Sequence, residues 1–290
     1  MSELDGENEI EKPYLKSGIE EGDRILEVNG KTVSSTNELI ERINETKGEG
    51  LNIKYIRDGE EKTAKITPAK VEKNEYKLGL WVRDTAAGVG TITFYEPSTK
   101  LFAALGHGIQ DVDTDKLITI ANGQIVTANI VNIRKGEKGK PGEIKGNIIG
   151  GQEVGEISKN TDFGIYGKLN NPTLLNINKS NEVEVAMRNE IKTGPAKIIC
   201  SVENNIREEF DVEIQKIYYN NNENNKSMIV KVTDEKLLEK TGGIIQGMSG
   251  SPILQNGKFV GALTHVLVSE PSMGYAVFAD IMIKQSREVE

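Results

Sequence analysis

The sequence contains few of the residues that build several common kinds of site. Its single cysteine, Cys200, excludes an internal disulfide. The only two histidines, His107 and His265, lie far apart in the chain, so we expect no metal site and no metal cofactor. Cys200 ends the apolar run Ile-Ile-Cys, which predicts a small core residue rather than a nucleophile.

Basic clusters and long apolar runs are also missing. The net charge is −8, and no group of Lys and Arg is interleaved with aromatic residues, which argues against a nucleic-acid partner. No stretch approaches the roughly 20 apolar residues that span a bilayer, and residues 1–5 do not resemble a leader. We therefore expect the chain as given to be soluble. A part cut from an anchored or exported protein would look the same.

With 290 residues, of which 37% are hydrophobic and 5% aromatic, the chain can bury a sizeable core. Glycine is frequent, with 30 residues, which indicates many tight turns. The length suits two domains, or one large β domain with an appendage.

Residues 17–70 show the signals of a small α+β unit. Asn29-Gly30 and Asp58-Gly59 are hairpin turns, and Ser35 with Glu38 forms a capping box before a helix that ends near Gly48. The order of strand, helix and hairpin, with the signature Gly-Ile-x-x-Gly-Asp-x-Ile-Leu-x-Val-Asn-Gly, resembles a PDZ domain of the kind attached to bacterial proteases. Such a domain binds a peptide C-terminus through an upstream loop and apolar strand. Residues 1–16 supply little of either, so the groove is expected to be incomplete.

From Leu78 onward, short apolar runs alternate with turn residues, as is typical of an all-β sandwich or barrel. We predict a PDZ-like domain over 1–70, a linker over 71–77 and a β domain over 78–290. Residues 136–142 and 220–225 are predicted to be surface loops that carry no chemistry.

The stretch Gly247-Met248-Ser249-Gly250-Ser251-Pro252 matches the turn that presents the nucleophile in chymotrypsin-like serine proteases. Its glycines permit a tight loop in which the amides of Gly247 and Ser249 converge on a developing oxyanion. The alternative is an ordinary Gly/Ser/Pro turn. The hairpin signal Asn256-Gly257, between apolar runs directly after the loop, favours the catalytic interpretation.

A serine nucleophile needs a base, most often histidine. His107 lies between glycines at the end of an apolar run and precedes Ser249 in the chain, which is the chymotrypsin-type order. His265 lies within the strand-like run that follows Ser249, so it is expected to pack locally.

Two residues compete for the carboxylate that orients the base. Asp162 precedes an apolar strand, at the place where chymotrypsin-like enzymes usually carry this residue. Asp234 lies shortly before Ser249, but it or Thr233 is also a natural N-cap for the helix-like run that follows. Spacing alone favours Asp162.

The run from Asp234 to Ile253 resembles the SpoIVB (stage IV sporulation protein B) peptidases of spore-forming bacteria. Residues 83–88, 91–97, 104–107 and 263–266 carry the same resemblance, which covers residues 17 to about 285. It implies a mainly β, chymotrypsin-like double β-barrel peptidase with a PDZ-like domain, and assigns His107, Asp234 and Ser249 as the triad. Asp162 remains the rival for the acid.

The resemblance also implies a regulatory role. Members of this family act in the space between forespore and mother cell, cleave themselves, and cut the extracytoplasmic part of a membrane-bound inhibitor. That cut releases an intramembrane protease that processes a sigma factor. The alternatives are a PDZ-based binding module on a body that no longer cleaves, and a general housekeeping protease.

Overall fold

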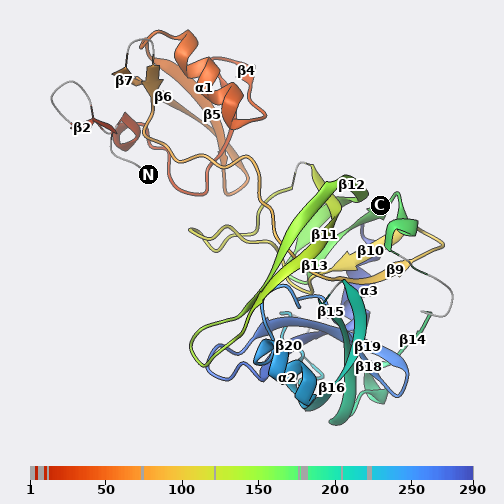
Figure 1. Cartoon of the computed structure of the whole chain (residues 1–290). Coiled ribbons are helices and arrows are strands. Elements are labelled where there is room, and N and C mark those ends of the chain that lie inside the picture. Colours follow the sequence, from red (N-terminus) through yellow and green to blue (C-terminus); the bar gives the residue numbers. More distant parts are fainter. Residues whose placement is uncertain are drawn as a thin grey trace. The chain divides into compact units, whose positions relative to one another are not determined.

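The computed structural model folds as two compact units (Figure 1). One comprises Met1–Ala87 with Asp111–Lys116, and the other Gly88–Gln110 with Leu117–Glu290. The residues that the structure describes are 4–5, 10–11, 13–72, 75–120, 122–175, 177, 182–203, 205–220 and 224–289.

The first unit is built on a four-stranded antiparallel sheet in the order β4-β3-β5-β6, accompanied by helix α1. Two small two-stranded sheets, β1-β2 and β7-β8, belong to the same unit. Its elements are β1 (Leu4–Asp5), β2 (Ile10–Glu11), the 3-10 helix η1 (Pro13–Lys16), β3 (Arg24–Val28), β4 (Lys31–Thr32), α1 (Thr36–Glu45), β5 (Leu51–Arg57), β6 (Glu60–Ile66), β7 (Ala69–Glu72) and β8 (Glu75–Lys77).

The local signals of this unit are confirmed. Asn29 and Asp58 adopt left-handed φ angles of 50° before their glycines, as the predicted hairpin turns require. Ser35 caps α1 by accepting a hydrogen bond from the Glu38 amide at 3.2 Å. The Glu38 carboxylate, however, accepts from Ser34 rather than from Ser35, so the reciprocal half of the capping box is shifted by one residue.

Leu39 and Ile43 of α1 pack into one core with the sheet. Leu78 is buried in the same core, so residues 78–87, which the sequence analysis assigns to the β domain, lie with the first unit. The run 78–82 is not a strand. The side chains of Leu4 and Ile10 lie outside the described residues, and the completeness of the peptide groove stays a prediction.

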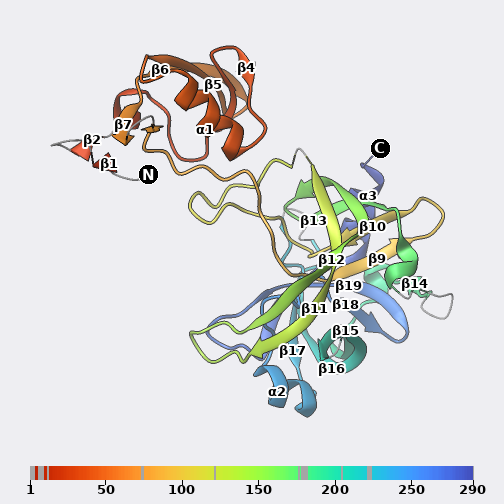
Figure 2. The same cartoon turned by 45° about the horizontal axis from the view of Figure 1, so that its top comes forward.

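The second unit begins with a five-stranded antiparallel sheet in the order β11-β12-β13-β10-β9. Its core is formed around Phe102, Val154 and Leu169. The long β11–β12 hairpin extends from this sheet toward the strands of the next one (Figure 2). The strands are β9 (Ile92–Glu96), β10 (Leu101–Ala104), β11 (Gly123–Arg134), β12 (Glu143–Thr161) and β13 (Gly164–Leu169), with a 3-10 helix, η2 (Pro172–Leu175), after them.

Six strands of the following sheet close into an antiparallel barrel, because β19 pairs with both β18 and β20. The order around the barrel is β19-β18-β15-β16-β17-β20, and the short β14 adds in parallel to β19. The elements are β14 (Glu184–Val185), the 3-10 helix η4 (Arg188–Glu190), β15 (Gly194–Glu203), β16 (Ile206–Ile217), β17 (Met228–Val232), α2 (Glu235–Thr241), β18 (Pro252–Gln255), β19 (Lys258–Val266), β20 (Met273–Phe278) and α3 (Ala279–Arg287).

A closed barrel preceded by a second antiparallel sheet is the chymotrypsin-like arrangement, so the predicted mainly β fold class is confirmed. The predicted hairpin is confirmed too: β18 and β19 join at Asn256-Gly257, with left-handed φ angles of 52° and 75°. No helix among the described residues has the length and apolarity to cross a membrane.

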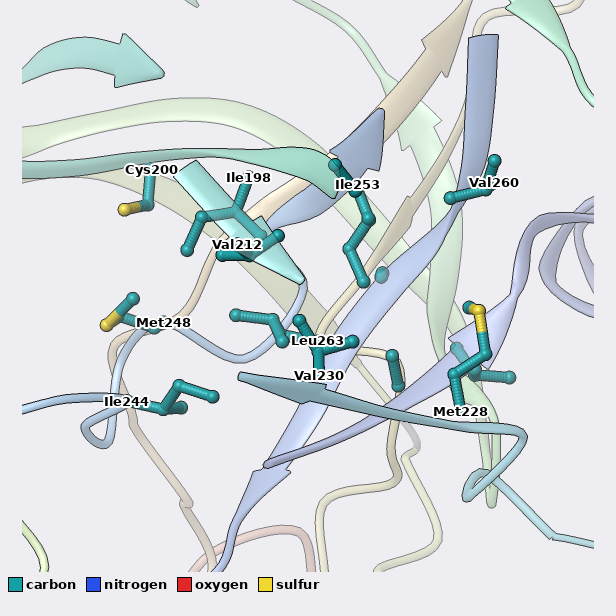
Figure 3. Packing of buried hydrophobic residues seen from close by; sticks show 14 of the residues in the cluster. Ile198, Cys200, Val212, Met228, Val230, Ile244, Met248, Ile253, Val260 and Leu263 are labelled. Carbon is teal, nitrogen blue, oxygen red and sulfur yellow. The ribbon is translucent and has the colours of Figure 1, made fainter. Parts of the chain in front are cut away.

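The apolar residues inside the closed barrel belong to one cluster, which includes Met248, Ile244 and Cys200 (Figure 3). Cys200 is the core residue that the sequence predicts, 2% exposed, and burial raises the pKa of its thiol to about 12. A thiol with that pKa is not ionised at neutral pH and is not a nucleophile. Met248 anchors the loop that carries Ser249 in this cluster.

Candidate active site

The loop between α2 and β18 carries Ser249, and its shape depends on glycine. Gly247 and Gly250 adopt φ angles of 99° and 91°, which side chains disfavour. A Cβ on Gly250 would also collide with the Thr91 carbonyl and lie 2.5 Å from the Leu105 nitrogen. The glycines that suggested a nucleophile turn are therefore required by both conformation and packing.

Thr91, just before β9, and Thr93, within β9, donate hydrogen bonds to the carbonyl groups of this loop. The Thr91 amide donates to the Ser249 carbonyl at 3.0 Å, and its hydroxyl donates to the Gly247 carbonyl at 3.2 Å. The Thr93 hydroxyl donates to the Gly250 carbonyl at 2.7 Å and is buried. These bonds fix the loop across the junction of the two sheets.

Some backbone amides of the loop donate hydrogen bonds within the protein, and two have no acceptor in the described part of the chain. Gly250 donates to the Leu263 carbonyl at 2.8 Å, and Met248 to the Ile245 carbonyl at 3.1 Å. The amides of Gly247 and Ser249 have no acceptor among the residues that the structure describes. Two unpaired amides on either side of Met248 are what an oxyanion hole needs, because donors already bonded to protein cannot stabilise a developing charge.

The Ser249 hydroxyl donates to the backbone carbonyl of Thr264 at 2.8 Å. This carbonyl lies in β19, next to His265. The hydroxyl must therefore turn about its Cα–Cβ bond before it can donate to a histidine base. Catalytic hydrogen bonds that are absent from a free enzyme often form only with substrate.

His107 follows the end of β10, where Leu105 and Gly106 turn the chain through φ angles of 70° and 69°. Its Nδ1 lies 2.8 Å from the Gly108 carbonyl. A carbonyl can only accept, so Nδ1 carries the proton and Nε2 is left with the lone pair that a general base requires. Burial lowers the pKa of His107 below 6.5, and the bond to Gly108 partly opposes this shift.

His265 lies against the candidate base, which the sequence analysis did not foresee. The two imidazole rings are 4.7 Å apart between centroids, at 34° to each other. Burial, followed by the charges of His107 and Lys226, lowers the pKa of His265. Gly106 packs on Thr264, since a Cβ there would lie 3.0 Å from the Thr264 methyl carbon. Ser249 and His107 thus both adjoin the pair Thr264-His265.

Asp234 is the N-cap of α2, the alternative that its sequence context offered. One carboxylate oxygen accepts from the Leu237 amide at 2.9 Å and the other from the Asp211 amide at 3.3 Å. Within the described part of the chain, no interaction joins Asp234 to His107.

Asp162 lies in the turn between β12 and β13, and its side chain is exposed. This turn flanks the segment that carries His107: a Cβ on Gly108 would lie 2.7 Å from the Thr161 carbonyl, and one on Gly164 would lie 3.3 Å from the Gly106 nitrogen. The Asp162 backbone carbonyl accepts a hydrogen bond from the Asn225 side chain at 2.8 Å. As the structure stands, the Gly108 carbonyl, not a carboxylate, is bonded to Nδ1 of His107.

The lowered pKa of His107 predicts a pH profile. A base must be neutral, so kcat/KM should rise with pH through an inflection below 6.5. The His265→Gln variant should keep this inflection if His107 is the base, as the sequence analysis predicts. A profile that loses its acid limb in this variant would assign the limb to His265.

Comparison with known proteins identifies two regions. Residues 74–283 match the family model described as SpoIVB peptidase S55, and residues 9–67 match a PDZ domain model. The resemblance read from the sequence and the PDZ-like module are confirmed.

Curated relatives share shorter parts of the chain. A DegP-like periplasmic serine endoprotease of a Marinomonas species is 27% identical over 134 residues, which is 41% of this chain and 28% of the relative. A protein of Lactococcus lactis named as a zinc metalloprotease is 30% identical over 118 residues, or 39% of this chain and 27% of the relative. The chain thus spans little more than a quarter of the length of these relatives. No group of three or more His, Cys, Asp or Glu in the described residues could hold a metal ion.

Two solved structures share limited similarity. An HtrA-type protease, AlgW, bound to a decapeptide has a TM-score of 0.35 and 12% identity, covering 50% of this chain and 43% of its own. A protease of M. tuberculosis in its active form has a TM-score of 0.34 and 11% identity, covering 72% of this chain and 94% of its own.

Proposed function

The chain belongs to the SpoIVB peptidase S55 family and is a serine peptidase, and from this premise we propose that Ser249 is its nucleophile and His107 its general base. The observation that carries the proposal is that the amides of Gly247 and Ser249, on the loop that presents the Ser249 hydroxyl, have no acceptor in the described part of the chain. Two amides without a protein acceptor, on either side of Met248 and beside the hydroxyl, can serve as the donors of an oxyanion hole.

The proposed reaction follows from these groups. Nε2 of His107 takes the Ser249 proton as the oxygen attacks the carbonyl carbon of the scissile peptide bond, and the amides of Gly247 and Ser249 bind the resulting oxyanion. His107 then gives the proton to the leaving amine. A water molecule, activated by the same nitrogen, hydrolyses the acyl-enzyme and restores Ser249.

For the acid we retain two candidates. The family resemblance supports Asp234, which the sequence analysis assigned. The β12–β13 turn, which lies against both neighbours of His107, supports Asp162. Either carboxylate would have to approach Nδ1 of His107 in place of, or together with, the Gly108 carbonyl.

The substrates of this peptidase are proteins, and we propose that it cleaves them for regulation rather than degradation. The family resemblance supports an exported peptidase that cuts itself and the extracytoplasmic part of a membrane-anchored inhibitor during sporulation. A PDZ domain in the same chain as the peptidase domain supports selection of substrate by peptide binding.

The test compares substrates. The purified chain should give a few defined fragments of itself and of such an inhibitor segment, while an unfolded test protein should survive. Rapid degradation of the unfolded protein would indicate a housekeeping protease. No cleavage of any substrate, with an intact fold, would indicate a PDZ-based binding module.

A further inference from the structure

The loop at the end of the β11–β12 hairpin spans residues 135–142, and residues 136–142 are predicted from the sequence to be a surface loop without chemistry. In the structure, backbone hydrogen bonds join this loop to two other segments of the second unit. The Gly136 amide donates to the Thr241 carbonyl at the end of α2, at 2.8 Å, and the Gly139 amide donates to the Val268 carbonyl at 2.9 Å. In both views of the molecule this hairpin end lies beside α2 and the β19–β20 connection (Figures 1 and 2). We call residues 135–142 the hairpin tip.

Gly142 and Ile144, around the start of β12, form hydrogen bonds with the amide and the carbonyl of Gln246. The Gln246 amide donates to the Gly142 carbonyl at 3.0 Å, and the Ile144 amide donates to the Gln246 carbonyl at 2.8 Å. Glu143 and Gln246 form an isolated parallel bridge between these two bonds. Gln246 immediately precedes Gly247, whose amide is one of the two unpaired donors.

Peptide planarity links these bonds to the oxyanion site. In a trans peptide the carbonyl and the following amide point in opposite directions. Because Ile144 holds the Gln246 carbonyl, the Gly247 amide must point away from β12. A half-turn of this peptide would break the bond to Ile144 and aim a carbonyl, instead of a donor, at the oxyanion.

Side-chain packing reinforces the same orientation. A Cβ on Gly247 would lie 2.9 Å from the Ile144 Cβ, so these residues are in close contact. A Cβ on Gly142 would lie 2.5 Å from the Arg134 carbonyl, the Gly136 nitrogen and a side-chain carbon of Ile245. Ile144 is 5% exposed and Ile245 is 1% exposed. The hairpin tip and the loop that carries Ser249 form one packed unit.

We propose that Gly142 and Ile144 are positioning residues, which set the direction of the Gly247 amide and so complete the oxyanion hole. The docked hairpin tip then switches the peptidase on, and displacement of the tip leaves the nucleophile in place but the oxyanion unsupported. This proposal rests on the proposed serine peptidase mechanism.

The test is Gly142→Ala, whose methyl group collides with three neighbours and should displace the tip. Loss of one oxyanion donor lowers kcat by about 10²- to 10³-fold. We expect that loss in kcat, a KM within about threefold, and a matching loss of affinity for a peptide boronic acid, which mimics the tetrahedral intermediate. The affinity for the amine-side product peptide, which has no carboxylate at the cleaved end to meet these amides, should not change.

Gly139→Asn is the matched control in the same tip. A Cβ at this position meets nothing within 4 Å, and asparagine tolerates its left-handed φ of 80°. This variant should retain wild-type kcat. Ile144→Pro, which removes the donor to Gln246, is a second variant that should reproduce the loss, with Ile144→Val as its control. Rates are referred to the folded fraction measured by thermal melting.

The outcomes separate two failures. An active wild type with Gly142→Ala and Ile144→Pro at full kcat would overturn the positioning role alone. An equal loss of boronic-acid and product affinity would also overturn it, because it would indicate general damage to the site. Activity that survives Ser249→Ala would overturn the underlying mechanism, whatever the tip variants do.

Discussion

Ser249→Ala is expected to lower peptidase activity by at least about 10³-fold, down to the residual level that binding and an oxyanion hole provide without a nucleophile. The measurement is the rate of appearance of self-cleavage fragments and of cleaved peptide substrate, with the thermal melting temperature recorded for each variant. The variant should remain folded, since the Ser249 hydroxyl bonds to a single backbone carbonyl.

Ser251→Ala is the control for this variant. Ser251 lies two residues further on in the same loop, and its buried hydroxyl has no hydrogen-bond partner among the described residues. Removing it should change neither rate nor stability by much. If both variants keep activity, Ser249 is an ordinary turn residue and the nucleophile assignment is wrong.

Asp162→Asn is the second change from which we expect a large effect. If Asp162, rather than Asp234, takes the place of the Gly108 carbonyl at Nδ1 of His107 in the working enzyme, its conversion to an amide should cost about 10⁴-fold in kcat, because the imidazole is then held in the wrong tautomer. The Thr161-Gly108 and Gly164-Gly106 contacts place this turn against the histidine segment, and they are the reason for the expectation.

The Asp234→Asn variant is compared with Asp162→Asn to decide which carboxylate is the acid. Asparagine caps helices about as well as aspartate, so a purely structural Asp234 should tolerate this change with little loss of stability or rate. A loss of several orders of magnitude at position 234, with a normal melting temperature and an active Asp162→Asn variant, would assign the acid to Asp234, as the family resemblance implies.

Local signals in the sequence predicted much of the fold. The Asn-Gly and Asp-Gly turns need only the freedom of glycine and the tolerance of asparagine and aspartate for left-handed backbone, so they were readable without tertiary information. Ser35 as an N-cap, Cys200 as a core residue and the β18–β19 hairpin after Ser249 were predicted for the same kind of reason.

Contacts between distant segments were not predictable in this way. His265 was expected to pack within its own hairpin, yet its ring lies on His107 because β19 and the segment after β10 meet across the two sheets. Residues 136–142 of the hairpin tip were predicted to be a surface loop without chemistry, since their glycines signal a turn but do not reveal that Gln246 bonds to both Gly142 and Ile144. The run 78–82 has strand-like composition, but Leu78 is buried in the core of the first unit instead.

We propose above all that Ser249, activated by His107, is the nucleophile of this peptidase. Labelling with a fluorophosphonate probe, followed by peptide mapping, tests it most directly, because the probe bonds only to a serine with an activated hydroxyl. We expect one labelled residue, Ser249, in the wild type and no label in His107→Ala. A wild type that is folded but unlabelled, or labelled at another serine, would contradict it.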